Sequence, residues 1–142
     1  MSIFTPAPPP WPSRVLSALR IVAGFMFITF GTMKLFGWPP SPVPVPPFEV
    51  MSQTWIGGVL ETVGGLLIML GLLTRPTAFI LSGEMAVAYF QFHQPMGALP
   101  PTNMGVPAVL YCWLFLYLVF AGAGVWSLDA LIARSRGEAR TS

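Results

Sequence analysis

The chain has 142 residues, of which 54% are hydrophobic and only 8% are charged, with seven Lys and Arg against five Asp and Glu. A water-soluble domain of this length needs a much larger charged fraction to cover its surface, so the composition excludes that class and indicates a one-domain integral membrane protein. A single cysteine, Cys112, excludes an internal disulfide, and the net charge of +2 gives no indication of nucleic-acid binding.

Four apolar segments follow one another along the chain, each close to the ~20 residues that a helix needs to span a hydrocarbon core. They cover residues 15–38, 55–73, 76–93 and 106–126. Backbone polar groups in lipid must be satisfied within the segment, so each segment is predicted to be a helix. The sequence therefore predicts an all-α, polytopic membrane protein, with residues 1–142 forming a single domain built as a bundle of four transmembrane helices.

The connections between these segments differ in character. The N-terminal tail contains "TPAPPPWP", and the first loop, residues 39–54, is equally rich in proline. Proline fixes φ and lacks a backbone donor, so both stretches are predicted to be extended polyproline II. The prolines of this loop are Pro39, Pro40, Pro42, Pro44, Pro46 and Pro47. The second and third segments are joined by "TRP" alone, which predicts a tight turn and an antiparallel pair of helices.

The arginines indicate how the chain is oriented. They lie at the start of the first segment, in the second connection and after the fourth segment, which are all on one side of a four-helix protein. These residues are Arg14, Arg20, Arg75, Arg134, Arg136 and Arg140. The opposite side has Lys34 as its sole basic residue. The positive-inside rule therefore predicts that both termini are cytoplasmic, in a bacterial cytoplasmic membrane.

The second segment carries a carboxylate, Glu61. A charge within a membrane segment is costly and by default marks a site. Glycines lie one helical turn away on both sides, and small residues let membrane helices approach closely, so Glu61 is predicted to face the interior of the bundle. Lys34, near the end of the first segment, lies at a similar depth with the opposite sign. A salt bridge or one-water contact is predicted between them. The alternatives are that Lys34 reaches to the interface, or that the pair is purely structural and fixes helix register without a ligand.

Glu84 in the third segment lies nearer the middle of the membrane and has no second basic residue at its depth. It is expected to be a neutral acid, to accept a hydrogen bond from Ser82, Tyr89 or Gln91, or to face water or a ligand. Gln91 and His93 follow towards the outer end, although a histidine at a helix end is commonly an interfacial residue. The candidate intramembrane polar site is Lys34, Glu61, Glu84, Gln91 and His93.

One histidine and one distant cysteine do not provide the convergent ligands of a metal centre, so no metal site is predicted. No nucleophile and base occur in a recognisable arrangement, and no catalytic residue is assigned.

Four stretches in order, "RIVAGFMFITFGTMKLFGW", "GGVLETVGGLLIMLGLLTRPTAFIL", "EMAVAYFQFHQP" and "LYCWLFLYLVFAGAGVWSLD", resemble the DoxX family of small four-helix integral membrane proteins. The more specific elements are Gly31-x-x-Lys34-Leu35, Glu61 followed by Gly64-Gly65, His93-x-Pro95 and Trp126-Ser127-Leu128-Asp129. One position departs from the family pattern: Val106 stands where many members have a glutamate entering the fourth helix.

The resemblance implies a membrane subunit that helps to bind a quinone or similar amphipathic molecule for an oxidoreductase system. Lys34, Glu61 and Glu84 would supply hydrogen bonds or a proton route, electrons would come from a partner, and no covalently bound cofactor is expected. The alternative is a non-catalytic accessory or structural subunit of a larger membrane complex, and a small transporter is a third reading. The expected partners are the lipid bilayer and either other membrane subunits or further copies of the chain, without nucleic acid.

Overall fold

The computed structural model describes residues 10–42 and 49–139, and all regular structure within these ranges is helical. Five α-helices follow in order: α1 (Trp11–Phe36), α2 (Gln53–Leu70), α3 (Thr74–Ala88), α4 (Val106–Ala121) and α5 (Leu128–Ala139). The π-helical turn η1 (Tyr89–His93) and the 3₁₀ turns η2 (Gln94–Met96) and η3 (Pro100–Thr102) lie between α3 and α4. The predicted all-α class is confirmed.

The first two helices begin earlier than predicted. α1 includes Trp11 and Pro12 because a proline in the first turn gives up no intrahelical hydrogen bond. α2 begins at Gln53, where the side chain of Ser52 accepts a hydrogen bond from the backbone N–H of Trp55 at 3.1 Å. The polyproline conformation predicted for the N-terminal tail and the first loop falls largely on residues 1–9 and 43–48, outside the described residues.

The fourth predicted segment is divided in the structure. α4 ends at Ala121 because Gly122 and Gly124 have φ angles of +80° and +76°, which a right-handed helix cannot accommodate. A further helix, α5, then begins after Ser127, whose hydroxyl accepts a hydrogen bond from Ala130 N at 3.1 Å. α5 was not predicted from the sequence, and the predicted count of four helices is not confirmed, because the described residues form five α-helices.

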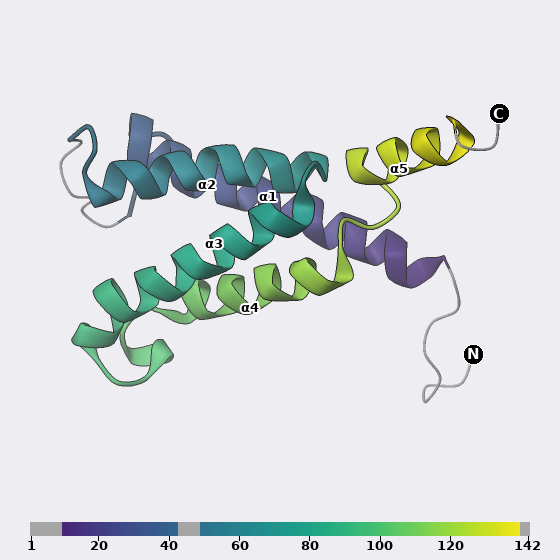
Figure 1. The fold of residues 1–142 in the computed structure, drawn as a ribbon. Helices are drawn as coiled ribbons and strands as arrows, with labels where there is room; N and C mark the ends of the chain where they lie inside the picture. The colour runs from purple at the N-terminus through teal and green to yellow at the C-terminus, as the bar shows by residue number, and fades with distance from the viewer. Residues whose placement is uncertain (1–9, 43–48, 140–142) are drawn as a thin grey trace.

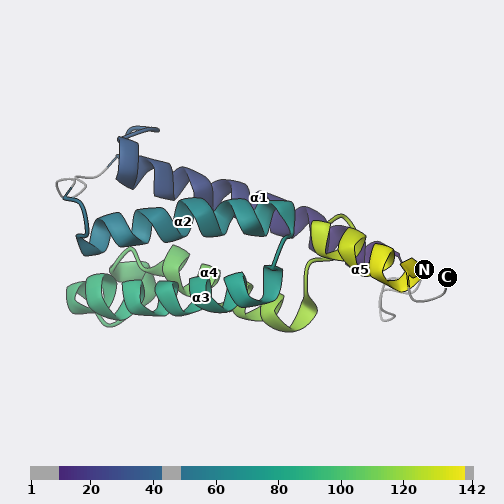
Figure 2. The ribbon, with the colours of Figure 1, turned by 45° about the horizontal axis from the view of Figure 1, so that its top comes forward.

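The four long helices form two layers, with α1 packed on α2 and α3 packed on α4 (Figure 2). α2 and α3 run antiparallel, as predicted, and the short turn between them joins one layer to the other (Figure 1). The described chain begins and ends at the same end of the bundle (Figure 1).

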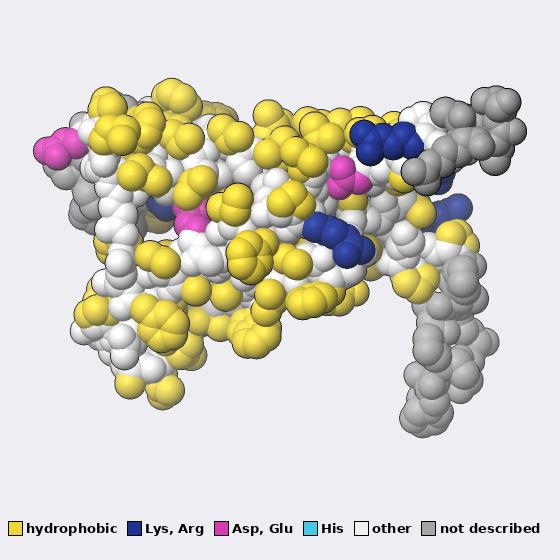
Figure 3. Space-filling model, viewed as in Figure 1, with side chains coloured by type: hydrophobic (Ala, Val, Ile, Leu, Met, Phe, Trp, Pro, Cys, Tyr) yellow, Lys and Arg dark blue, Asp and Glu magenta, His cyan; other side chains and the backbone are white. Residues whose placement is uncertain are grey.

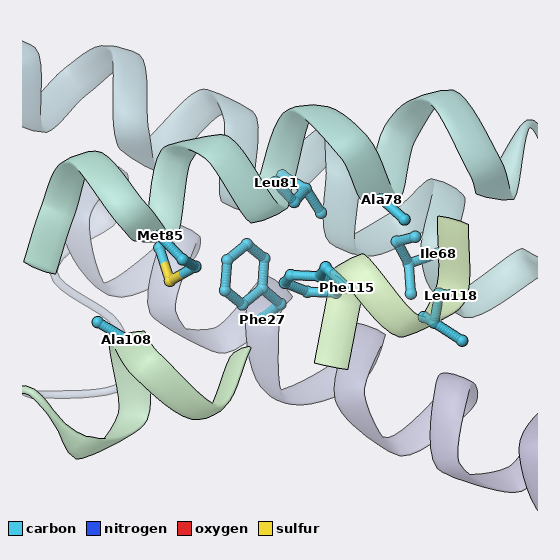
Figure 4. Close-up of a cluster of buried hydrophobic side chains, with 8 residues drawn as sticks. All are labelled: Phe27, Ile68, Ala78, Leu81, Met85, Ala108, Phe115 and Leu118. Atoms are coloured by element: carbon cyan, nitrogen blue, oxygen red, sulfur yellow. The ribbon is translucent and has the colours of Figure 1, made fainter. Parts of the chain in front are cut away.

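Apolar side chains from α1, α2, α3 and α4 meet between the layers (Figure 4). Phe27 and Phe115 are packed edge to face, with ring centroids 4.8 Å apart and an interplanar angle of 77°. The cluster consists of Phe27, Ile68, Ala78, Leu81, Met85, Ala108, Phe115 and Leu118. This core fixes α3 and α4 against the α1–α2 pair.

Glycines bring the backbones of α1 and α2 into direct contact. A Cβ atom placed on Gly24 would lie 2.6 Å from the backbone nitrogen of Met69 and 2.7 Å from the carbonyl oxygen of Gly65. One placed on Gly31 would lie 2.6 Å from the backbone nitrogen of Thr62. This contact is closer than any larger residue permits, and it confirms the role predicted for the small residues.

The outward faces are apolar, as a lipid environment requires. Phe25, Val63, Phe79 and Phe120 are all more than half exposed, and hydrophobic atoms cover much of the face seen in Figure 3. Of the described helices, α1 and α2 are long and apolar enough to cross a membrane, and α4 is a shorter apolar helix. These features fit an all-α membrane protein.

The end of the bundle that carries Arg14, Arg20, Arg75, Arg134 and Arg136 is called the arginine end below, and basic side chains gather there in Figure 3. Arg20 on α1 is fully buried and donates hydrogen bonds to four backbone carbonyls. In the loop between α4 and α5, Nε donates to Ala123 O at 2.8 Å and Nη2 donates to Trp126 O at 2.5 Å. At the end of α2, Nη1 donates to Met69 O at 2.6 Å and also to Ile68 O. A single side chain thus connects α1, the end of α2 and the loop between α4 and α5.

Candidate functional site

Lys34 on α1 and Glu61 on α2 form an ion pair, with 2.7 Å between Nζ and Oε1. The predicted contact is therefore confirmed. Glu61 is 3% exposed, so it faces the interior of the bundle as its glycine neighbours predicted. Its second oxygen, Oε2, is buried and has no hydrogen-bond partner among the described residues. The ion pair thus uses only half of the Glu61 carboxylate.

Glu84 on α3 approaches the same region from the other layer. A Cβ atom placed on Gly57 would lie 3.4 Å from Glu84 Oε1 and 3.8 Å from Lys34 Nζ, so both groups face the small space beside Gly57. Glu84 Oε2 is buried and, within the described parts of the chain, accepts no hydrogen bond. Two acidic side chains and one ammonium group therefore converge, and two buried carboxylate oxygens remain unpaired.

A cleft of about 280 Å³ opens beside these groups and is called the carboxylate cleft here. Its polar lining comes from Lys34, Gln53, Thr54 and Glu84. The rest of the lining is mainly apolar, and consists of Ile56, Gly57, Leu60, Ile80, Met85, Val87, Ala88 and Phe92. Acidic and basic atoms lie side by side within a largely hydrophobic face in Figure 3. An apolar pocket with a few convergent polar groups is the usual form of a small-molecule site.

The expected hydrogen-bond donors to Glu84 make other contacts. The Ser82 hydroxyl donates to Cys112 O at 2.9 Å. Gln91 accepts a hydrogen bond from Gln53 Nε2, which connects it to the edge of the cleft through a lining residue. Tyr89 packs against the rings of Phe90 and His93. Glu84 is therefore left facing the cleft without an internal hydrogen-bond partner among the described residues, so the predicted internal donors are not observed, and the neutral acid and the group facing water or a ligand stay predictions.

His93 does not line the carboxylate cleft. Its Nδ1 lies 3.0 Å from the carbonyl oxygen of Asn103, so the imidazole connects η1 to the loop that precedes α4. Asn103 is 1% exposed; it donates from Nδ2 to Gly97 O at 2.7 Å and accepts from Gly105 N at 2.8 Å. His93 therefore stabilises the connection between α3 and α4 and does not belong to the cleft.

The structure thus brings together Lys34, Glu61 and Glu84, places Gln91 at the edge, and separates His93 from them. Of these groups Lys34 and Glu84 line the cleft: the Glu84 carboxylate can accept hydroxyl or N–H donors, and the Lys34 ammonium group can donate to a carbonyl oxygen. Among the described residues, no three His, Cys, Asp or Glu side chains converge, so this part of the chain offers no metal centre.

The roles of two residues, Gln53 and Arg20, were not predicted from the sequence. Gln53 lines the cleft because α2 begins before the predicted boundary, and Ser52 as an N-cap residue was the available signal. Arg20 was interpreted only as a marker of orientation, whereas it is a buried connector of three segments. There was little indication of this role in the sequence, because Arg20 donates to backbone carbonyl oxygens, which are present in every residue and therefore leave no recognisable pattern of residue types.

The DoxX family model matches residues 15–94. The chain is 47% identical over 117 residues to an uncharacterised protein of Haemophilus influenzae, covering 80% of this chain and 87% of that protein. It is 30% identical over 120 residues to the inner membrane protein YqjF of Escherichia coli, covering 80% and 88% of the two chains.

A membrane protein of Mycobacterium tuberculosis, Rv3486, is 28% identical over 159 aligned positions, covering 94% of this chain and 95% of the relative. No solved structure shows significant similarity to the chain.

Proposed function

The chain belongs to the DoxX family of membrane proteins, and on this premise we propose that its carboxylate cleft binds the head group of a quinone or similar amphipathic molecule for a membrane oxidoreductase system. The observation that carries the proposal is the carboxylate of Glu84, which lines an apolar cleft together with Lys34 and whose buried Oε2 has no hydrogen-bond partner among the described residues. Buried polar atoms without partners are rare in proteins, and an external donor is a direct explanation for them.

The size and lining of the cleft favour a ring-sized head group. Ligand pockets commonly span roughly 300–1,000 Å³, and 280 Å³ lies at the lower limit of that range. Ile80, Val87 and Phe92 would contact the apolar part of the ligand, because they line the cleft from the α3 and η1 side. A long apolar tail would then lie in lipid along the outward faces of the helices.

The polar groups of the cleft suit both redox states of such a molecule. Lys34 can donate to a ring carbonyl oxygen, and Glu84 can accept from a ring hydroxyl group. A carboxyl group beside a bound hydroxyl can also take up or release its proton, with Glu61 and Lys34 balancing the charge nearby. Electrons would come from a partner protein in the same membrane.

The accessory-subunit alternative is favoured by one observation, the direct ion pair that joins α1 to α2. If that pair and Glu84 serve only packing, Glu84→Gln should be silent because the amide preserves hydrogen bonding and volume, whereas Glu84→Leu should disturb assembly. The ligand-binding proposal expects Glu84→Gln to fold and assemble normally and yet to lose the bound molecule.

Purification of the full chain in mild detergent, followed by solvent extraction and mass spectrometry of bound quinone, tests the proposal. Near-stoichiometric quinone with the wild type and with Glu49→Gln, which alters an exposed carboxylate outside the cleft, would support it. Glu84→Gln should lose most of that quinone. Equal amounts of quinone in Glu84→Gln and the wild type would contradict it, as would purification without quinone from quinone-replete membranes.

We further propose that the chain resides in a bacterial cytoplasmic membrane with both termini on the cytoplasmic side. The support is that the arginines of the described chain lie at one end of the bundle, together with both ends of the described chain. The partners proposed are the surrounding bilayer and other membrane subunits or further copies of the chain.

A further inference from the structure

A second hollow, of about 460 Å³, lies at the arginine end, far from the carboxylate cleft in the fold. It lies between the start of α3 and the loop that joins α4 to α5, and is called the arginine-end pocket here. Thr74, Arg75 and Pro76 line one side, and Gly122, Gly124 and Asp129 line the other.

The carboxylate of Asp129 in this pocket caps the start of α3. Its Oδ1 accepts from Leu73 N and its Oδ2 from Thr74 N, each at 2.9 Å. These bonds satisfy two of the free N–H groups at the start of α3 and fix α5 against that helix. Each Asp129 oxygen thus accepts one backbone N–H, and within the described residues Asp129 forms no ion pair with Arg75.

Two side chains that line the pocket, Thr74 and Arg75, are donors that have no acceptor within the described residues. Thr74 is 0% exposed, and its Oγ1 has no hydrogen-bond partner within the described residues. The guanidinium group of Arg75 forms no hydrogen bond or ion pair within the same ranges, and its Nε and Nη2 lie 3.6 Å from the point where a Cβ atom on Gly122 would be. The backbone N–H of Arg75, in the first turn of α3, has no intrahelical acceptor.

From this surplus of donors we propose that the arginine-end pocket binds a phosphate group, and that its source is the head group of an anionic phospholipid. A hydroxyl, a guanidinium fork and a helix N-terminus are the groups that proteins commonly use to bind phosphate oxygens. The pocket is at an end of a membrane-embedded bundle, where the apolar side chains of Leu73 and Pro76 also line it. Phospholipid phosphates are concentrated at that level of the membrane.

Native mass spectrometry of the full chain in detergent, titrated with phosphatidylglycerol or phosphatidylcholine, tests the proposal. The wild type should retain phosphatidylglycerol preferentially, and Arg75→Gln and Thr74→Val should each weaken that retention roughly tenfold, as expected for loss of a charge-assisted hydrogen bond. Thr74→Ser should restore it, because the hydroxyl returns. Arg134→Gln is the matched control: it removes the same charge from the same end but lies outside the pocket.

Three results would overturn the proposal. Equal weakening by Arg134→Gln and Arg75→Gln would indicate diffuse attraction at the surface rather than a site. Retention by Thr74→Val equal to the wild type would show that the hydroxyl binds nothing. Binding of inorganic phosphate that depends on Arg75, without any preference for phosphatidylglycerol, would assign the pocket to a soluble phosphate compound instead of a lipid.

Discussion

Lys34 Nζ and Glu61 Oε1 lie 2.7 Å apart, and the ion pair joins α1 to α2 at a point where the two helix backbones are almost in contact. Glu61 is nearly inaccessible, whereas the side chain of Lys34 is 33% exposed on the side of the carboxylate cleft. Glu61 is therefore the buried partner, which stabilises the bundle, and Lys34 is the accessible partner, which can contact a ligand.

Removing one partner should destabilise the bundle. Lys34→Met leaves a buried, uncompensated carboxylate, and breaking a buried pair costs about 3–5 kcal/mol in comparable cases, with the exposure of Lys34 favouring the lower value. The double variant Lys34→Met with Glu61→Gln should be less destabilised than Lys34→Met alone. The free energy of unfolding in detergent for the four members of the cycle measures this. Additive losses would show that the residues act independently.

The ion pair is also where sequence reasoning was most effective. The contact between Lys34 and Glu61 was predicted from three features: their similar depth in the membrane, their opposite charges and the glycines on their helix faces. These features were sufficient because the regular geometry of a helix relates the spacing of residues in the sequence to their depth and to the face on which they lie. Glu84 was grouped with this pair in the candidate site, but the approach of its carboxylate to the space beside Gly57 could not be predicted in the same way. Its position depends on how the α3–α4 layer packs on the α1–α2 layer, which is a tertiary property that no local pattern records.

Boundaries and connections were less predictable. The apolar pattern continues past Ala121 to Trp126, and the helix ends where Gly122 and Gly124 adopt positive φ, which apolarity alone does not reveal. His93 was grouped with the site because it follows Glu84 towards the same end. The π-helical turn η1 and the buried Asn103 instead direct it into the connection before α4.

The glycine contact between α1 and α2 can be tested with a matched pair of alanine substitutions. Gly24→Ala would place a methyl group 2.6 Å from Met69 N, so the helices must separate, and overpacking of this kind typically costs about 1–3 kcal/mol. Gly83→Ala has no heavy atom within 4 Å and should be neutral or stabilising by up to about 1 kcal/mol. Thermal unfolding in detergent compares them. Equal effects of the two substitutions would contradict close α1–α2 packing.

Loss of Arg20 should be among the most damaging single changes. Arg20→Met removes the donor to four carbonyl oxygens at once, of which Ile68 O keeps a second donor in Gly71 N, and each buried acceptor left unsatisfied costs about 1–3 kcal/mol. Arg20→Lys should rescue little, because an ammonium group lacks the planar fork. Arg14→Met, at an exposed position on the same helix, is the control and should change stability by less than about 1 kcal/mol. Similar yields and unfolding temperatures for Arg20→Met and Arg14→Met would refute the connecting role.

Orientation can be measured in intact cells. In a Cys112→Ser background, Ser41→Cys should react with a membrane-impermeant maleimide added from outside, because the loop after α1 is proposed to face away from the cytoplasm. Ser135→Cys, on the exposed part of α5 at the arginine end, should react only after the membrane is permeabilised. The reverse pattern, with Ser41→Cys labelled only from the cytoplasm, would invert the proposed topology.

Direct binding of a short-tailed benzoquinone to the full chain in lipid nanodiscs tests the central claim, that the carboxylate cleft holds a quinone head group. We expect saturable binding by the wild type and by Glu49→Gln, and an affinity reduced roughly tenfold in Glu84→Gln, because a neutral amide is a weaker acceptor than a carboxylate and cannot take up or release a proton. Lys34→Met should weaken binding as well, provided that its circular dichroism spectrum remains that of the folded chain. Unchanged affinity in Glu84→Gln, or binding that does not saturate in the wild type, would contradict the account.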